Sequence, residues 1–187
     1  MEREKALSQI SEFQVEKLSP EERESLILDW WGIDEDDIEY MRLPIELREE
    51  VKSCDSPRSN VMNVKYNPLL VEAVKHQYIG VKNSYLANYL SSLLGRKIDV
   101  IGDEDVLLEC FCCHYLTIKE RGNYEICAVC GWEDDGSNNK EIYSNANHMT
   151  LSEGQFNFQK KHHSMKTMDL ETSLKIREKY FWLNSMQ

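Results

Sequence analysis

The chain has 187 residues and a formal net charge of −11, and 41% of its residues are hydrophobic. This is enough for one packed domain or two small ones. No run of about 18 apolar residues could span a membrane, and the polar N-terminus has no apolar signal core, so we expect a cytoplasmic protein. The negative charge opposes general binding to a phosphate backbone, which needs clustered Lys and Arg, and favours a basic partner.

The first predicted helices follow clear start signals. Ser19-Pro20-Glu21-Glu22 supplies a capping serine, a proline at the first helical position and a glutamate that can complete a capping box. We expect a short helix over Asp34–Met41, with Ile33, Ile38 and Met41 facing inward. Another helix is predicted from Pro44 to Val51.

Two more helices are predicted from apolar residues at helical spacing. Asn67 is expected to cap the first, with Pro68 at its first helical position, and this helix ends near Gly80. Asn83 or Ser84 caps the second, which Gly95 closes. The spacing is similar to that of a helix-turn-helix, but the acidic charge is wrong for DNA, so we interpret the pair as a helical hairpin or tight corner.

After Gly95 the pattern changes to short apolar and β-branched runs. Strands are expected at residues 98–101, 106–108, 115–118 and 124–126. Arg121-Gly122-Asn123 would form the turn of a hairpin between the last two. Thr150-Leu151-Ser152-Glu153 is a second capping box that starts a helix, and Asp169–Leu183 is predicted to be a C-terminal helix.

Six cysteines in a chain without a secretion signal indicate reduced thiols or metal ligands. Four of them form two Cys-x-x-Cys pairs, Cys110–Cys113 and Cys127–Cys130, with 13 residues between them. Two residues between thiolates allow a tight turn to direct both sulfurs at one ion, and the intervening hairpin brings the pairs together. Four thiolates suit a structural Zn²⁺ with no open position for chemistry, although iron can use the same ligands.

Other roles for these cysteines remain open. A redox dithiol would place one pair at a helix start in a βαβ context, which is missing here. Cys112 is surplus to a four-ligand site and could replace a neighbour, pack in the hairpin or act as a redox-sensing thiol. Cys54 has no assigned role, and we interpret His114 as a bystander.

These patterns predict an α+β chain with a mainly helical N-terminal part, a small zinc-ribbon-like β module and C-terminal helices. The expected segments are a weakly ordered N-terminus at 1–18, a helical region at 19–97, a metal-binding β module with its following helix at 98–160, and a C-terminal helix at 161–187.

Residues 109–136 read ECFCCHYLTIKERGNYEICAVCGWEDDG. This segment resembles the bacterial cysteine-rich CPCC family, whose pattern is Cys-Pro-Cys-Cys-Gly, a Thr-Leu-x-Glu-Arg-Gly hairpin and Ile-Cys-Pro-Val-Cys-x-Trp-Glu-Asp-Asp. The resemblance covers about residues 108–160. Phe111 and Ala128 stand where the family has prolines, and His114 stands where it has glycine. The resemblance implies that Cys110, Cys113, Cys127 and Cys130 are the metal ligands, and it allows an immunity-type role beside a secreted toxin.

No nucleophile elbow, phosphate loop, HExxH pair or dinucleotide fingerprint is present, so we expect no enzymatic activity. Residues 1–60 hold 17 acidic and 8 basic side chains. We therefore predict an acidic, metal-stabilised immunity or antitoxin protein that neutralises a cognate toxin with a basic surface. The candidate partner-binding residues are Asp34, Glu35, Asp36, Asp37, Trp132, Glu133, Asp134 and Asp135.

The alternative function is a zinc-ribbon module that contacts nucleic acid or the transcription apparatus. It would use a modest basic tail formed by Lys160, Lys161, Lys166, Lys175, Arg177 and Lys179. The overall charge of the chain opposes this alternative.

Overall fold

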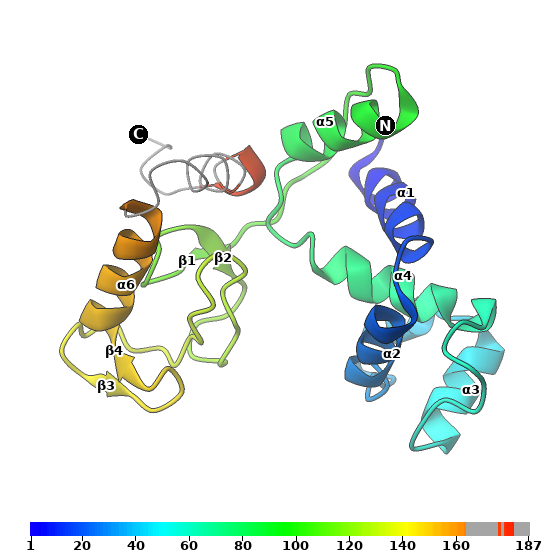
Figure 1. Ribbon diagram of the computed structural model, residues 1–187, viewed down its shortest axis with the longest axis horizontal. Coiled ribbons are helices and arrows are strands. Elements are labelled where there is room, and N and C mark those ends of the chain that lie inside the picture. The colour runs from blue at the N-terminus through cyan, green and yellow to red at the C-terminus, as the bar shows by residue number, and fades with distance from the viewer. Residues whose placement is uncertain (164–175, 177, 182–187) are drawn as a thin grey trace. The chain divides into compact units, whose positions relative to one another are not determined.

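The computed structural model describes residues 1–163, 176 and 178–181, and the chain divides into two compact units (Figure 1). Unit 1 is Met1–Tyr78 and unit 2 is Ile79–Gln187. Unit 1 is helical, whereas unit 2 combines helices with small antiparallel strand pairs. This confirms the predicted α+β class. No helix in the described part of the chain has the length and apolar character needed to cross a membrane.

Unit 1 contains four α-helices and two 3₁₀ turns in its described residues. These are α1 (Arg3–Val15), α2 (Pro20–Asp29), η1 (Tyr40–Arg42), α3 (Ile45–Ser53), η2 (Val64–Tyr66) and α4 (Asn67–His76). Helix α4 packs against α1 and α2. Its Leu69 and Leu70 are fully buried, as is Tyr66 just before it, so α4 is the centre of this core.

Residues expected to be weakly ordered at 1–18 instead include helix α1. Ala6 and Ile10 lie one helical turn apart and are completely buried, and Val15 is nearly so. These apolar residues gain burial only when α4 packs on them, about 60 residues further along the chain. The local pattern near the N-terminus could not reveal that contact.

The capping box at the start of α2 is confirmed. Ser19 Oγ accepts from the Glu22 N–H at 3.2 Å, and Glu22 Oε2 accepts from the Ser19 N–H at 2.8 Å. The predicted Asn67 cap is wrong, because Tyr66 occupies the cap position of α4. Asn67 Oδ1 instead accepts a hydrogen bond of 2.8 Å from the buried guanidinium of Arg23.

The helix predicted over Asp34–Met41 is also wrong, because turns precede the short η1. Asp34 Oδ1 accepts from the Asp36 N–H, and Asp37 Oδ2 accepts from the Asp34 N–H, each at 3.0 Å. Such local side-chain bonds compete with helical hydrogen bonds. As a result Ile38 and Met41, which we expected to face inward, are 66% and 61% exposed.

Unit 2 begins with a helix that we had assigned to the preceding region. Its elements are α5 (Asn83–Leu94), β1 (Leu108–Glu109), β2 (Leu116–Ile118), β3 (Tyr143–Ser144), β4 (Met149–Thr150) and α6 (Leu151–His163). The Asn83 side chain donates to Gly102 O at 2.8 Å, and Ser91 Oγ accepts from the Ile98 N–H at 2.8 Å. These contacts tie α5 to the segment after it, so the boundary falls at residue 78 rather than 97.

The strands of unit 2 differ in part from the prediction. Strand β1 pairs antiparallel with β2, and β3 with β4, a pair that the sequence did not indicate (Figure 1). Residues 124–126 form no strand, and Ile126 makes only an isolated bridge to Glu133. Residues 98–101, which we expected to form a strand, likewise form no strand. Most of the predicted helix Asp169–Leu183 lies outside the described residues.

Helix α6 starts as its capping box predicts. Thr150 Oγ1 accepts from the Glu153 N–H at 3.2 Å, while Glu153 Oε2 accepts from the Thr150 N–H at 2.8 Å. Leu151 in the first turn is buried. The helix thereby covers one side of the cysteine-containing turns, with Gly154 facing Trp132 and Cys112.

Candidate metal centre

The first cysteine turn connects β1 to β2. The Cys110 N–H donates to Tyr115 O at 2.8 Å, and the His114 N–H donates to Cys110 O at 2.9 Å. The chain therefore folds back over Cys110 and Cys113 within five residues. This brings both sulfur atoms into one buried cluster.

The second cysteine turn has the same hydrogen-bond pattern. The Cys127 N–H donates to Trp132 O at 2.8 Å, and the Gly131 N–H donates to Cys127 O at 2.9 Å. Cys130 lies at the position in this turn that Cys113 holds in the first. One local structure thus occurs twice, and each copy contributes two sulfurs.

The four sulfur atoms form a single group, here called the four-cysteine cluster: Cys110, Cys113, Cys127 and Cys130. All four Sγ atoms lie within 4.8 Å of one another. The distances Cys110–Cys130 and Cys113–Cys127 are both 3.6 Å. A tetrahedron with Zn–S bonds of about 2.3 Å has an edge of about 3.8 Å, whereas a disulfide bond measures about 2.05 Å. The cluster therefore has the spacing of metal ligands, and none of its cysteines is in a disulfide.

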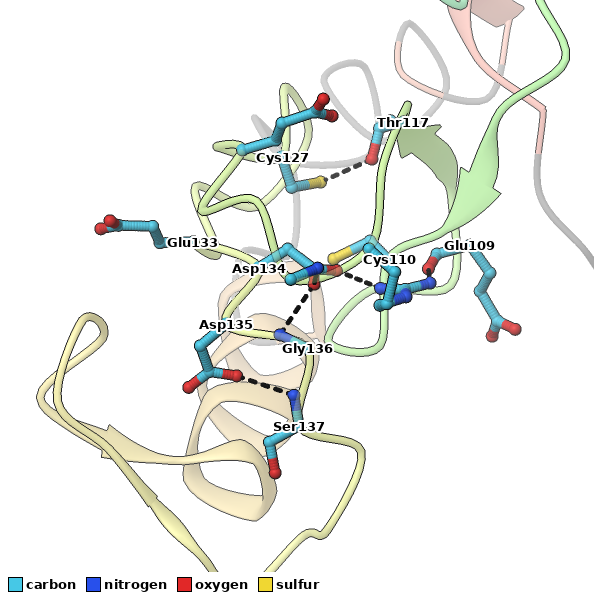
Figure 2. A network of polar contacts seen from close by, with 12 residues as sticks. Glu109, Cys110, Thr117, Cys127, Glu133, Asp134, Asp135, Gly136 and Ser137 are labelled. Atoms are coloured by element: carbon cyan, nitrogen blue, oxygen red, sulfur yellow. Dashed lines mark hydrogen bonds and ion pairs between the residues drawn. The ribbon is translucent and has the colours of Figure 1, made fainter.

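Hydrogen bonding favours the thiolate form at one member of the cluster, against the effect of burial. Thr117 Oγ1 lies 3.0 Å from Cys127 Sγ (Figure 2), and the Val129 N–H donates to the same sulfur at 3.4 Å. Hydrogen bonds from the other three cluster thiols hold the pKa of Cys127 below its ordinary value, and Thr117 adds to this effect. Hydrogen bonds to the thiols of Cys110 and Cys127 raise the pKa of Cys113. Without a cation, one thiolate in the cluster disfavours ionisation of its neighbours. A bound cation would stabilise several thiolates together.

The cluster leaves little room for catalysis. Cys110, Cys113 and Cys127 are buried, with at most 3% of each residue exposed, and only Cys130 is partly exposed among the four. Four protein sulfurs complete a tetrahedral coordination shell without a water ligand. The residues present fit a structural metal ion.

A buried ion pair holds the loop between the two cysteine turns. The Arg121 guanidinium pairs with Asp134 and also donates to Glu109 O. Asp134 Oδ1 accepts from the Gly122 N–H at 2.9 Å and from the Gly136 N–H at 3.0 Å; Figure 2 shows the latter contact. With 1% of its surface exposed, Asp134 is a structural residue.

Thr117 and Arg121 support the site but were not among the predicted site residues. Both fall at the Thr and Arg positions of the hairpin pattern quoted above, which was the available signal. Arg121 also stacks on Phe111, with 3.8 Å between the guanidinium carbon and the ring centroid. Phe111 stands at the position where the family pattern has proline, so this contact supports the first turn by other means.

The partner surface predicted at Trp132–Asp135 is not formed as an exposed patch. Trp132 and Asp134 are buried. Asp135 Oδ1 accepts from the Ser137 N–H at 3.0 Å (Figure 2), and the Glu133 N–H donates to Asn147. These residues mainly build the module around the cysteine turns.

The other predicted partner residues are all exposed. Asp34, Glu35, Asp36 and Asp37 lie in the turn before η1 of unit 1. Glu35 pairs with Lys52 of α3 at 3.2 Å. This acidic turn therefore lies on the surface and belongs to a different unit from the four-cysteine cluster.

The fold and the site define a small β module built on two cysteine turns, with four sulfurs spaced so that they could hold a metal ion, and covered by a helix. Residues 108–177 match the family described as Cysteine-rich CPCC. This match confirms the resemblance read from the sequence for this part of the chain, and unit 1 lies outside the match. Neither the curated proteins nor the solved structures provide a match to the chain.

Proposed function

We propose that this protein is a zinc-stabilised immunity or antitoxin protein that binds a cognate bacterial toxin with a basic surface. The observation that carries the proposal is the exposed acidic turn Asp34–Asp37 beside exposed apolar side chains of the same unit. A surface that combines charge with large apolar groups is typical of a protein–protein contact. The closed four-cysteine cluster supports a structural role for the metal.

The apolar part of this surface consists of Ile38, Met41 and Ile45, which are at least 61% exposed. Hydrogen bonds from Tyr40 N–H to Asp37 O and from Arg42 N–H to Glu39 O form successive three-residue turns that carry Ile38 and Met41. Met41 Sδ lies 3.7 Å from Arg48 Nη1.

Arg48 lies three residues after Ile45 on α3, so both project from the same face of that helix. Met41 therefore lies along the face that carries Ile45. We name this surface, residues 34–38, 41 and 45, the acidic–apolar surface.

A basic partner would approach this surface faster because opposite charges steer the encounter. The turn backbone is held by its own Asp34 and Asp37 carboxylates, so the backbone needs little further ordering on binding. Apolar residues of the partner would then pack on Met41 and its neighbours. Charge would govern association, and apolar contact would govern residence time.

Zinc is the proposed metal because four thiolates at this spacing suit it. Elemental analysis of the purified chain should find about one zinc per chain. Iron in place of zinc would change the metal but keep the closed site. A chain without stoichiometric metal would overturn this part of the proposal.

The toxin-blocking role is tested with the protein encoded next to this chain's gene. Expressed alone it should arrest growth, and co-expression of this chain should restore growth. A neighbour that is harmless, or a toxic neighbour that this chain neither binds nor neutralises, would contradict the immunity role.

The binding surface is tested on the same pair by association kinetics. Glu35→Lys with Asp36→Lys should slow association about tenfold at low salt and less at high salt. Glu21→Lys with Glu24→Lys makes the same charge change on exposed positions of α2 and should have a smaller effect. If both double substitutions slowed association equally, only the net charge would matter. The acidic–apolar surface would then not be the binding site.

The nucleic-acid alternative gains no support from the described residues. Lys179 is half-buried, and its ammonium lies 5.3 Å from the centroid of the Tyr180 ring. Burial also lowers the pKa of Lys179. Salt-dependent binding of arbitrary RNA or DNA by the purified chain would favour this alternative.

A further inference from the structure

Two adjoining cavities of unit 2 form a groove between helix α6 and the β3–β4 hairpin (Figure 1). The first has a volume of about 340 Å³ and reaches the second cysteine turn, and the second has a volume of about 600 Å³. Both volumes lie within the range of about 300–1,000 Å³ that is typical of ligand sites. Met149 and Asn157 line both cavities, so we name the two together the α6 groove.

Helix α6 has one face for the core of unit 2 and another for the groove. Leu151 and Gly154 are buried, on the side that covers the cysteine turns. The second cavity is lined by exposed residues at helical positions i, i+1, i+4 and i+5, which share the opposite face: Ser152, Glu153, Phe156 and Asn157. The core of unit 2 therefore leaves this face of α6 open to a ligand.

Two aromatic side chains are exposed in the second cavity. Tyr143 of β3 is 55% exposed, and Phe156 of α6 is 63% exposed. A single exposed apolar side chain is ordinary, but two aromatic rings that line one cavity indicate a binding surface. The face of an aromatic ring is electron-rich and attracts cations, so these rings suit a positively charged group as well as an apolar one.

The hairpin wall of the groove is held in place by Asn147. Its Nδ2 donates to Glu133 O and to Ser144 Oγ, both at 2.8 Å, and its Oδ1 accepts from the Glu133 N–H at 2.8 Å. These three hydrogen bonds join the hairpin to the chain that leaves the second cysteine turn. The groove is therefore formed before a ligand binds, which lowers the ordering cost of binding.

The groove carries negative charge. Glu133 lines the first cavity and Glu153 the second, and among the described residues neither cavity is lined by a lysine or an arginine. Glu153 Oε2 accepts from the Thr150 N–H and hydroxyl, and these hydrogen bonds lower the pKa of Glu153, so it is ionised at neutral pH. No described residue donates to Glu153 Oε1, which is open to a ligand. These carboxylates would repel a phosphate and attract a cation.

We propose that the α6 groove binds an extended segment of a protein partner that carries an arginine and an apolar residue two positions apart. The planar guanidinium stacks on the rings of Tyr143 and Phe156 and pairs with Glu153 Oε1. Side chains two positions apart in an extended segment point the same way, about 7 Å from each other. The apolar side chain therefore enters the adjoining first cavity, which Trp132 and Phe158 line.

The test follows the amide chemical shifts of the zinc-loaded full chain while the peptide acetyl-Leu-Ala-Arg-Ala-Leu-amide is added. It places an apolar residue on both sides of the arginine, so either chain direction is covered. We expect saturable shifts at residues 129–133 and 142–158, with a Kd of about 1 mM. The peptide with glutamine in place of arginine should bind about fivefold more weakly, and so should the peptide with alanine in place of both leucines.

Glu153→Gln and Phe156→Ala should each weaken binding of the arginine peptide about fivefold. Glutamine keeps the capping box of α6, so Glu153→Gln removes the charge alone and should leave binding of the glutamine peptide unchanged. Glu141→Gln and Val106→Ala are the matched controls, because both residues are exposed in unit 2 and line neither cavity. The zinc content and thermal midpoint of each variant are measured first, so that misfolding is separated from altered binding.

Three results would overturn the proposal. The first is equal affinity for the arginine and glutamine peptides, or no shifts at about 10 mM of the arginine peptide. The second is a set of shifts confined to residues outside the groove. The third is groove shifts that depend on protein concentration without peptide, which would assign the groove to a second copy of this chain. Failure of toxin binding would leave these readouts unaffected, so the two proposals are tested separately.

Discussion

His114 and Gly131 hold the same position in two equivalent turns, each as the residue directly after the second cysteine. Their φ angles are 65° and 75°, in the left-handed region that favours glycine. The N–H of each donates to the carbonyl of the first cysteine in its turn. One turn therefore has its preferred residue, while the other carries a side chain that strains the backbone.

His114→Gly is expected to stabilise unit 2 by about 1 kcal/mol, because it removes left-handed strain from a non-glycine residue. The lost contact between His114 and Glu109 is partly exposed to solvent and contributes little. Gly131→Ala is the reciprocal variant and should destabilise by about 1 kcal/mol through backbone strain, since nothing lies within 4 Å of its new Cβ. Thermal unfolding of the zinc-loaded chain measures both. Equal signs for the two changes would contradict the equivalence of the turns.

Thr117→Val should weaken metal binding about tenfold, because it removes the hydroxyl 3.0 Å from Cys127 Sγ while keeping the shape of the side chain. Thr117→Ser retains the hydroxyl and should lose less affinity. Competition with a chelator of known affinity measures the difference. Similar affinities for the Val and Ser variants would show that the hydroxyl does not support the thiolate.

Arg121→Met should destabilise unit 2 by about 3 kcal/mol, because it leaves the Asp134 carboxylate buried without its counter-charge. Asp134→Asn in the same background should recover part of that loss. A double-mutant cycle from denaturant unfolding gives the coupling between the two residues. If the losses of unfolding free energy in the single variants added up to the loss in the double variant, the ion pair would not stabilise unit 2.

Metal removal should unfold the module of unit 2 and leave unit 1 folded, because the four cysteines all belong to unit 2. Chelation would increase amide hydrogen exchange around Cys110–Cys130, whereas the α4 helix would stay protected. Mass spectrometry resolves both regions in one sample. Uniform loss of protection would show that the two units fold as one.

Glu50 should make the stability of unit 1 depend on pH. Burial alone would raise the pKa of Glu50, but hydrogen bonds from Lys65, the Arg58 N–H and Tyr66 lower it from 4.5 to about 2. A carboxyl with a depressed folded-state pKa stabilises the fold above pH 4.5 and loses that contribution as the pH falls from 4.5 to about 2.

Glu50→Gln should cost about 1–3 kcal/mol at neutral pH and flatten the acid dependence, because it cannot ionise. Hydrogen exchange in α3 and α4 of the full chain measures the effect on this unit alone. Glu46→Gln, an exposed position on the same helix, is the control. If the stability of unit 1 still fell at acid pH in Glu50→Gln, other carboxyl groups would be responsible for that pH dependence.

Several features could be predicted because their causes are local in sequence. The two Cys-x-x-Cys pairs are such a case, as are the capping boxes Ser19–Glu22 and Thr150–Glu153. In each, the interacting groups lie within five residues, so spacing nearly determines their geometry. The four-cysteine cluster and the starts of α2 and α6 were predicted on that basis.

Tertiary structure decided which side chains are buried and which distant ones meet. Helix α1 depends on α4, the acidic turn exposes Ile38 and Met41, and Asp134 is enclosed by Arg121 and two glycine amides. Periodicity predicts that an apolar face exists, but burial depends on which segment packs on it, and no local pattern contains that information.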